Sequence, residues 1–329
     1  MNLPLLSVEN LSVSLDAGAA SVPLVRNVSF SIDRGETLCL VGESGCGKSL
    51  TALAIIGLLN REVMQVSSGR ILFEGRDLIS LGAGEMRRLR GDRIAIVFQE
   101  PMTSLNPVQR IGRQIAEVIV EHRGVSEADA LKQVLRLLDL VRIPDAARRA
   151  QEFPHQLSGG MRQRVMIAMA LALQPALLIA DEPTTALDVT IQAQVLTLID
   201  DLRREFDTSV LLITHDLGVV AEMADRVVVL YAGSVAEQAD VDDLFDRPVH
   251  PYTRGLLGAI RQLNSGSRDR LAEIPGNVPN PVSLDAGCAF RKRCASAMPI
   301  CHSERPPLQG DGLHRSACWL AKVGEEVMA

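Results

Sequence analysis

Residues 42–49 read Gly-Glu-Ser-Gly-Cys-Gly-Lys-Ser, and this stretch decides how the chain folds. An apolar run, residues 37–41, precedes it, and a helix-forming run, residues 50–56, follows it. A strand, a glycine-rich turn and a helix in this order form a phosphate-binding loop. The glycines let the backbone turn tightly with its N–H groups pointing inward, and the positive end of the following helix also favours an anion. Taken alone, the motif could also be a flexible glycine turn without a ligand.

The loop predicts specific contacts with a nucleoside triphosphate and its metal ion. Lys48 is expected to place its charge beside the β and γ phosphates, and Ser49 to offer its hydroxyl group to Mg²⁺. The candidate nucleotide-binding residues of the loop are Gly42, Glu43, Ser44, Gly45, Cys46, Gly47, Lys48, Ser49 and Leu50. Cys46 holds a variable position of the motif, and its thiol is assigned no role.

Residues 177–183 read Leu-Leu-Ile-Ala-Asp-Glu-Pro, the pattern of a buried parallel strand with polar residues at its carboxyl end. Open α/β sheets bind ligands at that end. Asp181 is therefore expected to hold Mg²⁺, directly or through water, and Glu182 to polarise the attacking water as the catalytic base. Without the glycine loop, an acidic pair in this place would more simply cap a helix.

Residues 157–163 read Leu-Ser-Gly-Gly-Met-Arg-Gln and open an apolar helical run. Ser158, Gly159 and Gly160 predict a second anion site, because a hydroxyl group and backbone N–H groups face outward at a helix start. The chain therefore has one nucleotide loop and two phosphate cradles.

With these segments in this order, the chain resembles the ATP-binding subunits of ABC transporters. In that family the signature that contains Ser158 and Gly160 reaches across a dimer interface to the γ-phosphate held by the partner. Met161 stands where the consensus has Gln. Asp188, in Thr-Ala-Leu-Asp, matches the loop that runs along the dimer interface. His215, after the apolar run 210–214, matches the histidine that contacts the γ-phosphate, although a histidine at a strand end is otherwise more often structural.

The resemblance assigns two further nucleotide contacts. Gln99 follows the strand-like residues 93–98 and matches the glutamine that touches Mg²⁺ or the attacking water. Leu15 takes the place where the family usually stacks an aromatic ring on adenine. Leucine covers the base with apolar surface only, so a stacking energy of about 0.5–1.5 kcal/mol is expected to be lost.

The composition fits a globular protein of one large or two modest domains, with 329 residues, 47% hydrophobic and 22% charged. Six cysteines without a secretory signal pattern favour a reducing compartment. The sequence has no apolar stretch of about 18 residues, so the chain is not expected to cross a membrane by itself. A net charge of −6 and 3% aromatic residues count against a nucleic-acid-binding surface.

We predict an α/β fold, a P-loop NTPase of ABC type with a mostly parallel core sheet, and a nucleotide-binding domain over residues 1–245. Residues 5–32 predict an N-terminal antiparallel β-subdomain of short alternating strands. Residues 101–165 resemble the family's inserted α-helical subdomain, whose groove receives a helix of a transmembrane subunit. Ordinary packing also explains their apolar stripes. The stripe residues are Ile111, Ile115, Val118 and Ile119, then Leu131, Val134, Leu135 and Leu138.

Residues 246–329 are predicted to be a C-terminal extension. Its segment His-Pro-Tyr-Thr-Arg-Gly-Leu-Leu, residues 250–257, resembles a segment of the ATPases that power dipeptide, oligopeptide and nickel importers. Pro248 and Pro251 predict a turn into a short helix. The proline-rich residues 274–279 are not expected to be helical.

Four of the six cysteines fall in this extension, with five, six and sixteen residues between successive members: Cys288, Cys294, Cys301 and Cys318. In a reducing compartment this density favours a metal site over disulfides. The arrangement is similar to the [4Fe–4S] motif of some peptide-importer ATPases. Four thiolates also suit Zn²⁺, and unmetallated thiols stay possible. His302 and His314 are near enough in sequence to replace a cysteine ligand.

The resemblance implies the ATP-hydrolysing subunit of an importer of dipeptides or oligopeptides, with ATP and Mg²⁺ as cofactors. It is expected to close over two ATP molecules with a second ATPase subunit, usually a paralogue. Its other expected partners are two transmembrane permease subunits and an extracytoplasmic substrate-binding protein. The expected location is the cytoplasmic face of the inner membrane, as a peripheral subunit. Alternatives are an importer of nickel or another small solute, and a soluble ABC ATPase that transports nothing.

Overall fold

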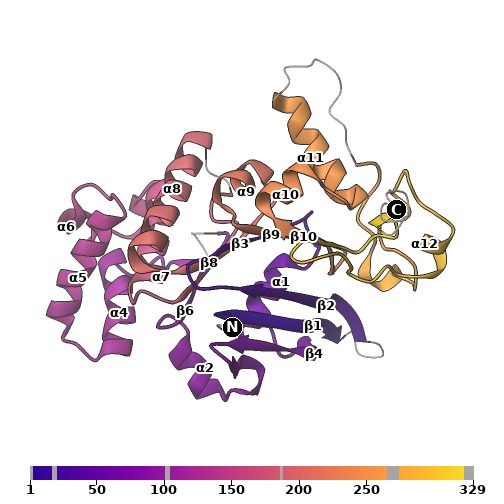
Figure 1. The fold of residues 1–329 in the computed structure, drawn as a ribbon. Helices are drawn as coiled ribbons and strands as arrows, with labels where there is room; N and C mark the ends of the chain where they lie inside the picture. The colour runs from indigo at the N-terminus through magenta and orange to yellow at the C-terminus, as the bar shows by residue number, and fades with distance from the viewer. Residues whose placement is uncertain (1–2, 17–20, 101–103, 186–187, 265–273, 322–329) are drawn as a thin grey trace. The chain divides into compact units, whose positions relative to one another are not determined.

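The structure is a computed structural model that describes residues 3–16, 21–100, 104–185, 188–264 and 274–321 (Figure 1). The chain divides into two compact units. The first combines Met1–Ile32, Thr37–Ile79 and Thr214–Ala329, and the second combines Asp33–Glu36 with Ser80–Ile213. Each unit joins segments that lie far apart in the sequence.

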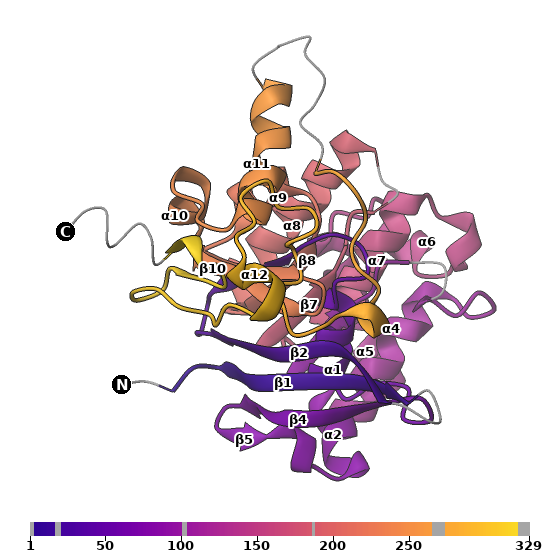
Figure 2. The same ribbon diagram turned by 90° about the vertical axis from the view of Figure 1, so that its right-hand side faces the viewer.

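An antiparallel sheet forms one layer of the first unit. Its strands are β1 (Leu6–Asp16), β2 (Ser21–Ile32), β4 (Met64–Phe73) and β5 (Arg76–Asp77), in the order β2-β1-β4-β5 (Figure 2). The prediction of short strands over residues 5–32 was wrong, because β1 and β2 have 11 and 12 residues. Register shifts between Val8 and Val13 break the alternation without ending the strand.

A second sheet of the first unit carries the glycine loop. Its strands are β3 (Thr37–Val41), β9 (Arg226–Tyr231), β10 (Ser234–Asp240) and β11 (Arg315–Ser316), in the order β11-β10-β9-β3. The pair β3 and β9 is parallel, and every residue of β3 is buried. The helices of this unit are α1 (Lys48–Ile55), α9 (Leu217–Met223), α10 (Val241–Asp246), α11 (Pro251–Asn264) and α12 (Ile300–Ser303).

The second unit is built on three parallel strands in the order β8-β7-β6: β6 (Ile94–Val97), β7 (Leu177–Asp181) and β8 (Ser209–Thr214). Strands β7 and β8 are buried throughout. The connections are helical, as parallel strands require. Its helices include α2 (Ala83–Leu89), α7 (Gly159–Leu171) and α8 (Val189–Phe206). The parallel strands predicted here and β9 in the first unit support the predicted α/β core.

The predicted helical insertion lies in the second unit as α4 (Ile111–Arg123), α5 (Glu127–Leu140) and α6 (Ala146–Arg149) (Figure 1). Residues 101–103, with which the predicted insertion begins, lie outside the described residues. The stripes bury Ile111, Ile115 and Ile119 on α4, and Val134 and Leu138 on α5. Leu131, which we expected on the buried stripe of α5, is 37% exposed.

The C-terminal extension packs its few aromatic side chains together. Tyr252 and Phe290 lie with ring centroids 5.5 Å apart, and both contact Tyr231 of β9. Helix α11 spans 14 residues, so the prediction of a short helix was wrong. Residues 274–279 form no helix, as their prolines predicted. Among the described residues, we find no helix that combines the length and the apolar character needed to cross a membrane.

His250 is the buried polar residue of this aromatic cluster. His250 is only 4% exposed, and its Nδ1 accepts a hydrogen bond from the backbone N–H of Tyr252 at 3.0 Å. Burial lowers the pKa of His250 from 6.5 to about 4. The imidazole is therefore neutral in the folded protein at pH 7. Protonation would place a poorly solvated charge in the cluster and would remove the lone pair of Nδ1 that accepts this hydrogen bond.

This burial predicts a loss of stability in mild acid. Between pH 6.5 and about 4 the unfolded chain holds the proton on His250 and the folded chain does not. The free energy of unfolding must then fall as the pH drops through this window, by up to about 3 kcal/mol at about 1.4 kcal/mol per pKa unit. Urea titrations at pH 7.5 and 4.5 should show a smaller fall for His250→Asn than for the wild type. Equal falls would contradict the assignment.

Candidate functional site

The glycine loop closes at Gly42, directly after β3. Gly42, Gly45 and Gly47 have φ angles of 152°, 78° and 102°, in the region that favours glycine. At Gly42 a β-carbon would lie 2.3 Å from the carbonyl oxygen of Leu230 and 2.7 Å from the Sγ of Cys46. Only glycine fits here, because the loop packs directly against β9.

Lys48 lies folded back over this loop. Its Nζ donates to the carbonyl oxygens of Gly42 at 2.7 Å and Glu43 at 3.2 Å, and the residue is 5% exposed. The ammonium group is thus held in the hollow of the loop by carbonyl groups that a phosphate could replace as its partner. Cys46 Sγ lies 4.0 Å from Nζ, and burial raises the pKa of this thiol, so it stays neutral beside the cation. Ser49 is exposed at the start of α1.

Glu182 is the centre of a hydrogen-bonded group in the second unit. Its Oε2 accepts a bond from Gln99 Nε2 at 3.0 Å and one from Thr185 Oγ1 at 2.9 Å. Its backbone has a φ of 47°, in the left-handed region, directly after β7. The structure thus joins two residues predicted from separate motifs. Asp181 is the last residue of β7 and is 7% exposed.

The hydrogen bond of Thr185 is a contact that the sequence analysis missed. The sequence shows it only as the first residue of the Thr-Ala-Leu-Asp segment that ends at Asp188. A hydroxyl group three residues after an acid at a strand end is the local signal that would have found it. Thr185 and Gln99 together orient the Glu182 carboxylate.

Ser158 and Asp188 both cap helices. The Oγ of Ser158 accepts a hydrogen bond from Met161 N at 3.3 Å at the start of α7, and a side-chain oxygen of Asp188 accepts one from Ile191 N at 2.9 Å at the start of α8. A β-carbon on Gly160 would lie 2.8 Å from Ile191, so the two helix starts lie against each other. Ser158 and Asp188 are exposed. Residues 186 and 187 of the same segment lie outside the described residues.

Two further predicted residues belong to the first unit. His215 is exposed between the end of β8 and Asp216, whose side chain caps α9 by accepting from Gly218 N at 2.8 Å. Leu15 is half-buried near the end of β1, with an apolar side chain as the sequence implied.

The four cysteines of the extension come together around one small cavity of about 20 Å³. Cys288 donates its backbone N–H to the carbonyl oxygen of Cys301 at 2.8 Å. Burial raises the pKa of Cys288, Cys294 and Cys318, the last to about 11.

Across the described part of the chain, no three or more His, Cys, Asp or Glu side chains, the four cysteines included, are arranged to hold a metal ion. Of the two histidines considered as ligands, His302 is exposed. His314 pairs instead with the buried Glu237, with 2.8 Å between Nε2 and Oε1.

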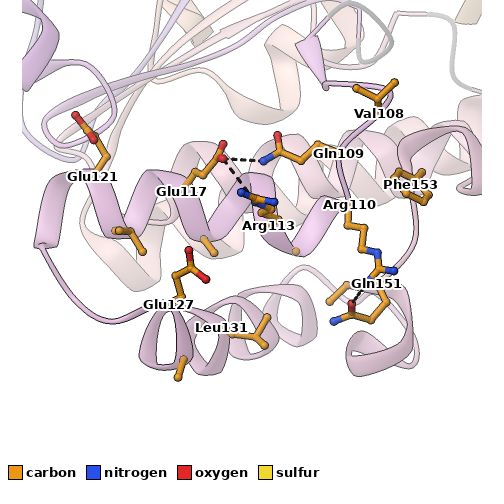
Figure 3. A pocket seen from close by; sticks show the side chains of 15 residues that line it. Val108, Gln109, Arg110, Arg113, Glu117, Glu121, Glu127, Leu131, Gln151 and Phe153 are labelled. Atoms are coloured by element: carbon orange, nitrogen blue, oxygen red, sulfur yellow. Dashed lines mark hydrogen bonds and ion pairs between the residues drawn. The ribbon is translucent and has the colours of Figure 1, made fainter.

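Helices α4 and α5 border a hollow of about 1030 Å³ (Figure 3). Its apolar lining includes Val108, which is 82% exposed, and Leu131. Glu117 accepts a hydrogen bond from Gln109 at 2.8 Å along one side, while Glu127 lies at the start of α5 (Figure 3). The exposure of Leu131 is explained by this hollow, because a stripe residue that faces a groove has no packing partner within the unit.

Comparisons with known families identify two regions. The model described as ABC transporter matches residues 25–185. The model described as Oligopeptide/dipeptide transporter, C-terminal region, matches residues 236–301. The second match contains the segment that begins at His250 and three of the four clustered cysteines.

Curated relatives match along nearly the whole chain. The chain is 51% identical over 316 residues to a probable peptide ABC transporter ATP-binding protein of Sinorhizobium fredii, covering 96% of this chain and 94% of the relative. It is 50% identical over 317 residues to the dipeptide transport ATP-binding protein DppD of Bacillus subtilis, with the same coverage of 96% and 94%. It is 50% identical over 309 residues to the oligopeptide transport ATP-binding protein OppD of Salmonella typhimurium, covering 93% and 90%.

Solved structures show the same cassette. A dimeric ATP-binding cassette, MJ0796, bound to ADP and Pi, matches with a TM-score of 0.64 at 30% identity, covering 72% of this chain and 98% of that chain. A second dimeric structure of MJ0796 matches with a TM-score of 0.64 at 31% identity and the same coverage of 72% and 98%.

Proposed function

Because the chain belongs to the ABC transporter family of ATP-binding proteins, we propose that it hydrolyses ATP to power an importer of dipeptides or oligopeptides. One observation carries this proposal. The nucleotide cassette and the oligopeptide/dipeptide-type C-terminal region stand in one chain that is 50% identical to the dipeptide transport protein DppD over 96% of its length. The alternative of a soluble ABC ATPase that transports nothing has no comparable support.

In the first unit, we assign the nucleotide phosphates to the loop. Its glycines with positive φ and the buried Lys48 support this assignment, because a glycine-rich turn ahead of a helix offers backbone N–H groups to an anion and Lys48 adds a cation. Lys48 binds the β and γ phosphates, His215 contacts the γ-phosphate, and Leu15 covers adenine.

In the second unit, the residues at the strand ends serve the metal ion and the water. Asp181 and Gln99 are the proposed Mg²⁺ ligands of this unit, and Ser49 stays the ligand that the loop motif predicts in the first unit. The ion would supply charge that stabilises the phosphates during transfer. Glu182 acts as the base that polarises the attacking water. Its hydrogen bonds from Gln99 and Thr185 hold the carboxylate in one orientation for this role.

A second ATPase subunit completes each site. Ser158, Gly159 and Gly160 present a helix N-terminus to solvent, where backbone N–H groups attract an anion. Asp188 and the neighbouring Val189, which is 84% exposed, continue this surface. The dimeric cassette MJ0796 supports a two-subunit arrangement, in which Ser158 reaches the γ-phosphate of the partner's ATP. The partner is a second copy or a paralogue.

The hollow beside α4 and α5 is the proposed contact with the permease subunits. Its open apolar lining suits a helix with an apolar face, and the carboxylates of Glu121 and Glu127 suit a basic residue at one end. The ATPase would then sit peripherally on the cytoplasmic face of the inner membrane, with a binding protein delivering peptide on the other side. We place the helical subdomain at residues 101–165 and the boundary to the extension at residue 246.

The four cysteines are proposed to hold a [4Fe–4S] cluster. The proposal rests on four soft sulfur ligands that line one cavity. The described side chains are not arranged around a metal ion, so binding of the cluster requires the four thiols to move together. Zn²⁺ is the alternative ligand for the same thiols. Bound metal would stabilise a loop-rich extension that has little apolar core.

Substitution of the base tests the chemistry. Glu182→Gln keeps an oxygen acceptor for Gln99 and Thr185 but cannot take a proton, so ATP turnover should fall about 100-fold or more while ATP affinity stays within about threefold. Phosphate release and fluorescent-nucleotide binding measure the two quantities, and uptake of labelled dipeptide by cells should be lost as well. Glu205→Gln, an exposed change on α8, is the control. Wild-type turnover by Glu182→Gln would refute the assigned base.

Substitution in the hollow tests the membrane partner. Leu131→Glu puts a charge on the apolar lining, so co-purification with the permease subunits from detergent-solubilised membranes should drop about tenfold or more. Ile79→Glu is a matched control, because Ile79 is 41% exposed and lies outside the hollow. If both variants co-purify equally well, the hollow is not the contact.

Metal analysis tests the cysteine cavity. Protein purified without oxygen should contain about four iron atoms and four sulfides per chain and absorb broadly in the visible range, and Cys294→Ser should lose both. Cys39→Ala, a buried change in β3, should keep them. Zinc in a colourless protein would favour Zn²⁺ as the bound metal. A protein that contains no iron and no zinc would contradict both proposals.

A further inference from the structure

Glu43, the second residue of the glycine loop, is held by an arginine 250 residues away in the sequence. Arg293 donates from Nη1 to Oε2 of Glu43 at 2.7 Å and from Nη2 to Oε1 at 3.0 Å. The two parallel bonds form the bidentate pair that a guanidinium group and a carboxylate make best. Both residues belong to the first unit.

Arg293 is itself fixed in place by the extension. Its Nε donates to the carbonyl oxygen of Pro275 at 2.9 Å, and its Nη2 also reaches that of Ile274 at 3.2 Å. Its guanidinium carbon lies 5.8 Å from the ring centroid of Tyr231 and 6.0 Å from that of Phe290. The side chain is only 7% exposed, and the bond to Glu43 raises the pKa of Arg293. An arginine held on so many sides cannot swing away from the loop without disturbing the extension.

A tyrosine of the extension holds the backbone of the same loop residue. The hydroxyl group of Tyr252 accepts a hydrogen bond from the N–H of Glu43 at 2.9 Å. Tyr252 is fully buried, and burial raises its pKa, so the hydroxyl stays neutral. Glu43 is therefore tied to the extension by its backbone through Tyr252 and by its side chain through Arg293.

We propose that Arg293 is a positioning residue for nucleotide binding, which acts through Glu43 on the phosphate-binding loop; this rests on the proposed function of that loop. Glu43 brings a carboxylate into a loop that must accept a triphosphate. Arg293 neutralises that charge and draws the carboxylate toward the extension. It also restricts a loop in which three glycines would otherwise sample many conformations. ATP affinity thereby depends on a residue outside the nucleotide cassette.

A double-mutant cycle on ATP affinity tests the proposal. With a fluorescent N-methylanthraniloyl derivative of ATP as the probe, Arg293→Gln should raise Kd about tenfold, because it leaves Glu43 charged and unpaired. Glu43→Gln should raise Kd clearly less than Arg293→Gln does, since it removes the charge along with the bond. The double variant should behave like Glu43→Gln, and Arg293→Lys should fall between wild type and Arg293→Gln, because it keeps the charge but loses the paired bonds.

Arg291→Gln is the matched control. Arg291 is also a poorly exposed arginine of the extension, at 10%, but it pairs with Asp285 and the carbonyl oxygen of Cys288 instead of the loop. It should leave Kd within about threefold of the wild-type value. An equal loss of affinity in Arg291→Gln and Arg293→Gln would mean that any loosening of the extension weakens binding, which overturns the specific role of Arg293.

The outcomes separate this inference from the proposed function. A wild type that does not bind the ATP probe refutes the function of the loop. A wild type that binds it, with Arg293→Gln unchanged, refutes the positioning role alone. An undiminished effect of Arg293→Gln in the Glu43→Gln background shows a purely structural role and refutes it too. If Arg293→Gln does not fold, as judged by circular dichroism, the cycle is completed with Arg293→Lys, whose effect must vanish in that background.

Discussion

The close approach of the phosphate-binding loop to β9 is the steric constraint on which the rest of the site depends. At Gly42 a β-carbon would overlap the carbonyl oxygen of Leu230, so the backbone there can be packed only with glycine. This approach fixes where α1 begins and hence where the N–H groups and Lys48 point. The affinity for an anion follows from this backbone geometry more than from any single side chain.

The residues proposed for catalysis in the second unit depend on parallel-strand order in the same way. Strands β6 and β7 lie side by side with their carboxyl ends together, so Gln99 and Glu182 meet although 83 residues separate them. Ser158 and Asp188 cap two helices whose starts touch, and both face solvent. The chain thus exposes the proposed phosphate cradle at Ser158 and buries Lys48 of the other, which supports the proposed sharing of sites with a second subunit.

The extension adds a layer of control to the cassette. It gathers Tyr252 and Phe290 around Tyr231, with His250 against Phe290, in a protein with only 3% aromatic residues. From this cluster Tyr252 and Arg293 reach Glu43 in the loop. Arg293 is followed directly by Cys294, one of the four cysteines around the small cavity. The ion pair Glu43–Arg293 and the peptide bond from Arg293 to Cys294 thus connect the nucleotide loop to the cysteine cavity.

The sequence by itself determined the α/β class, the family and the strand, loop and helix around Lys48, because these follow from local demands: positive φ at glycine, apolar runs for buried strands and a hydroxyl or carboxylate at helix starts. The helical stripes were equally readable, apart from Leu131, whose exposure depends on a hollow that periodicity cannot show. Only the tertiary structure decided that Thr185 and Gln99 share the Glu182 carboxylate and that Arg293 pairs with Glu43. Such pairs join residues that are separated along the chain, and no local pattern of residue types encodes which distant partner the fold will bring within hydrogen-bonding distance.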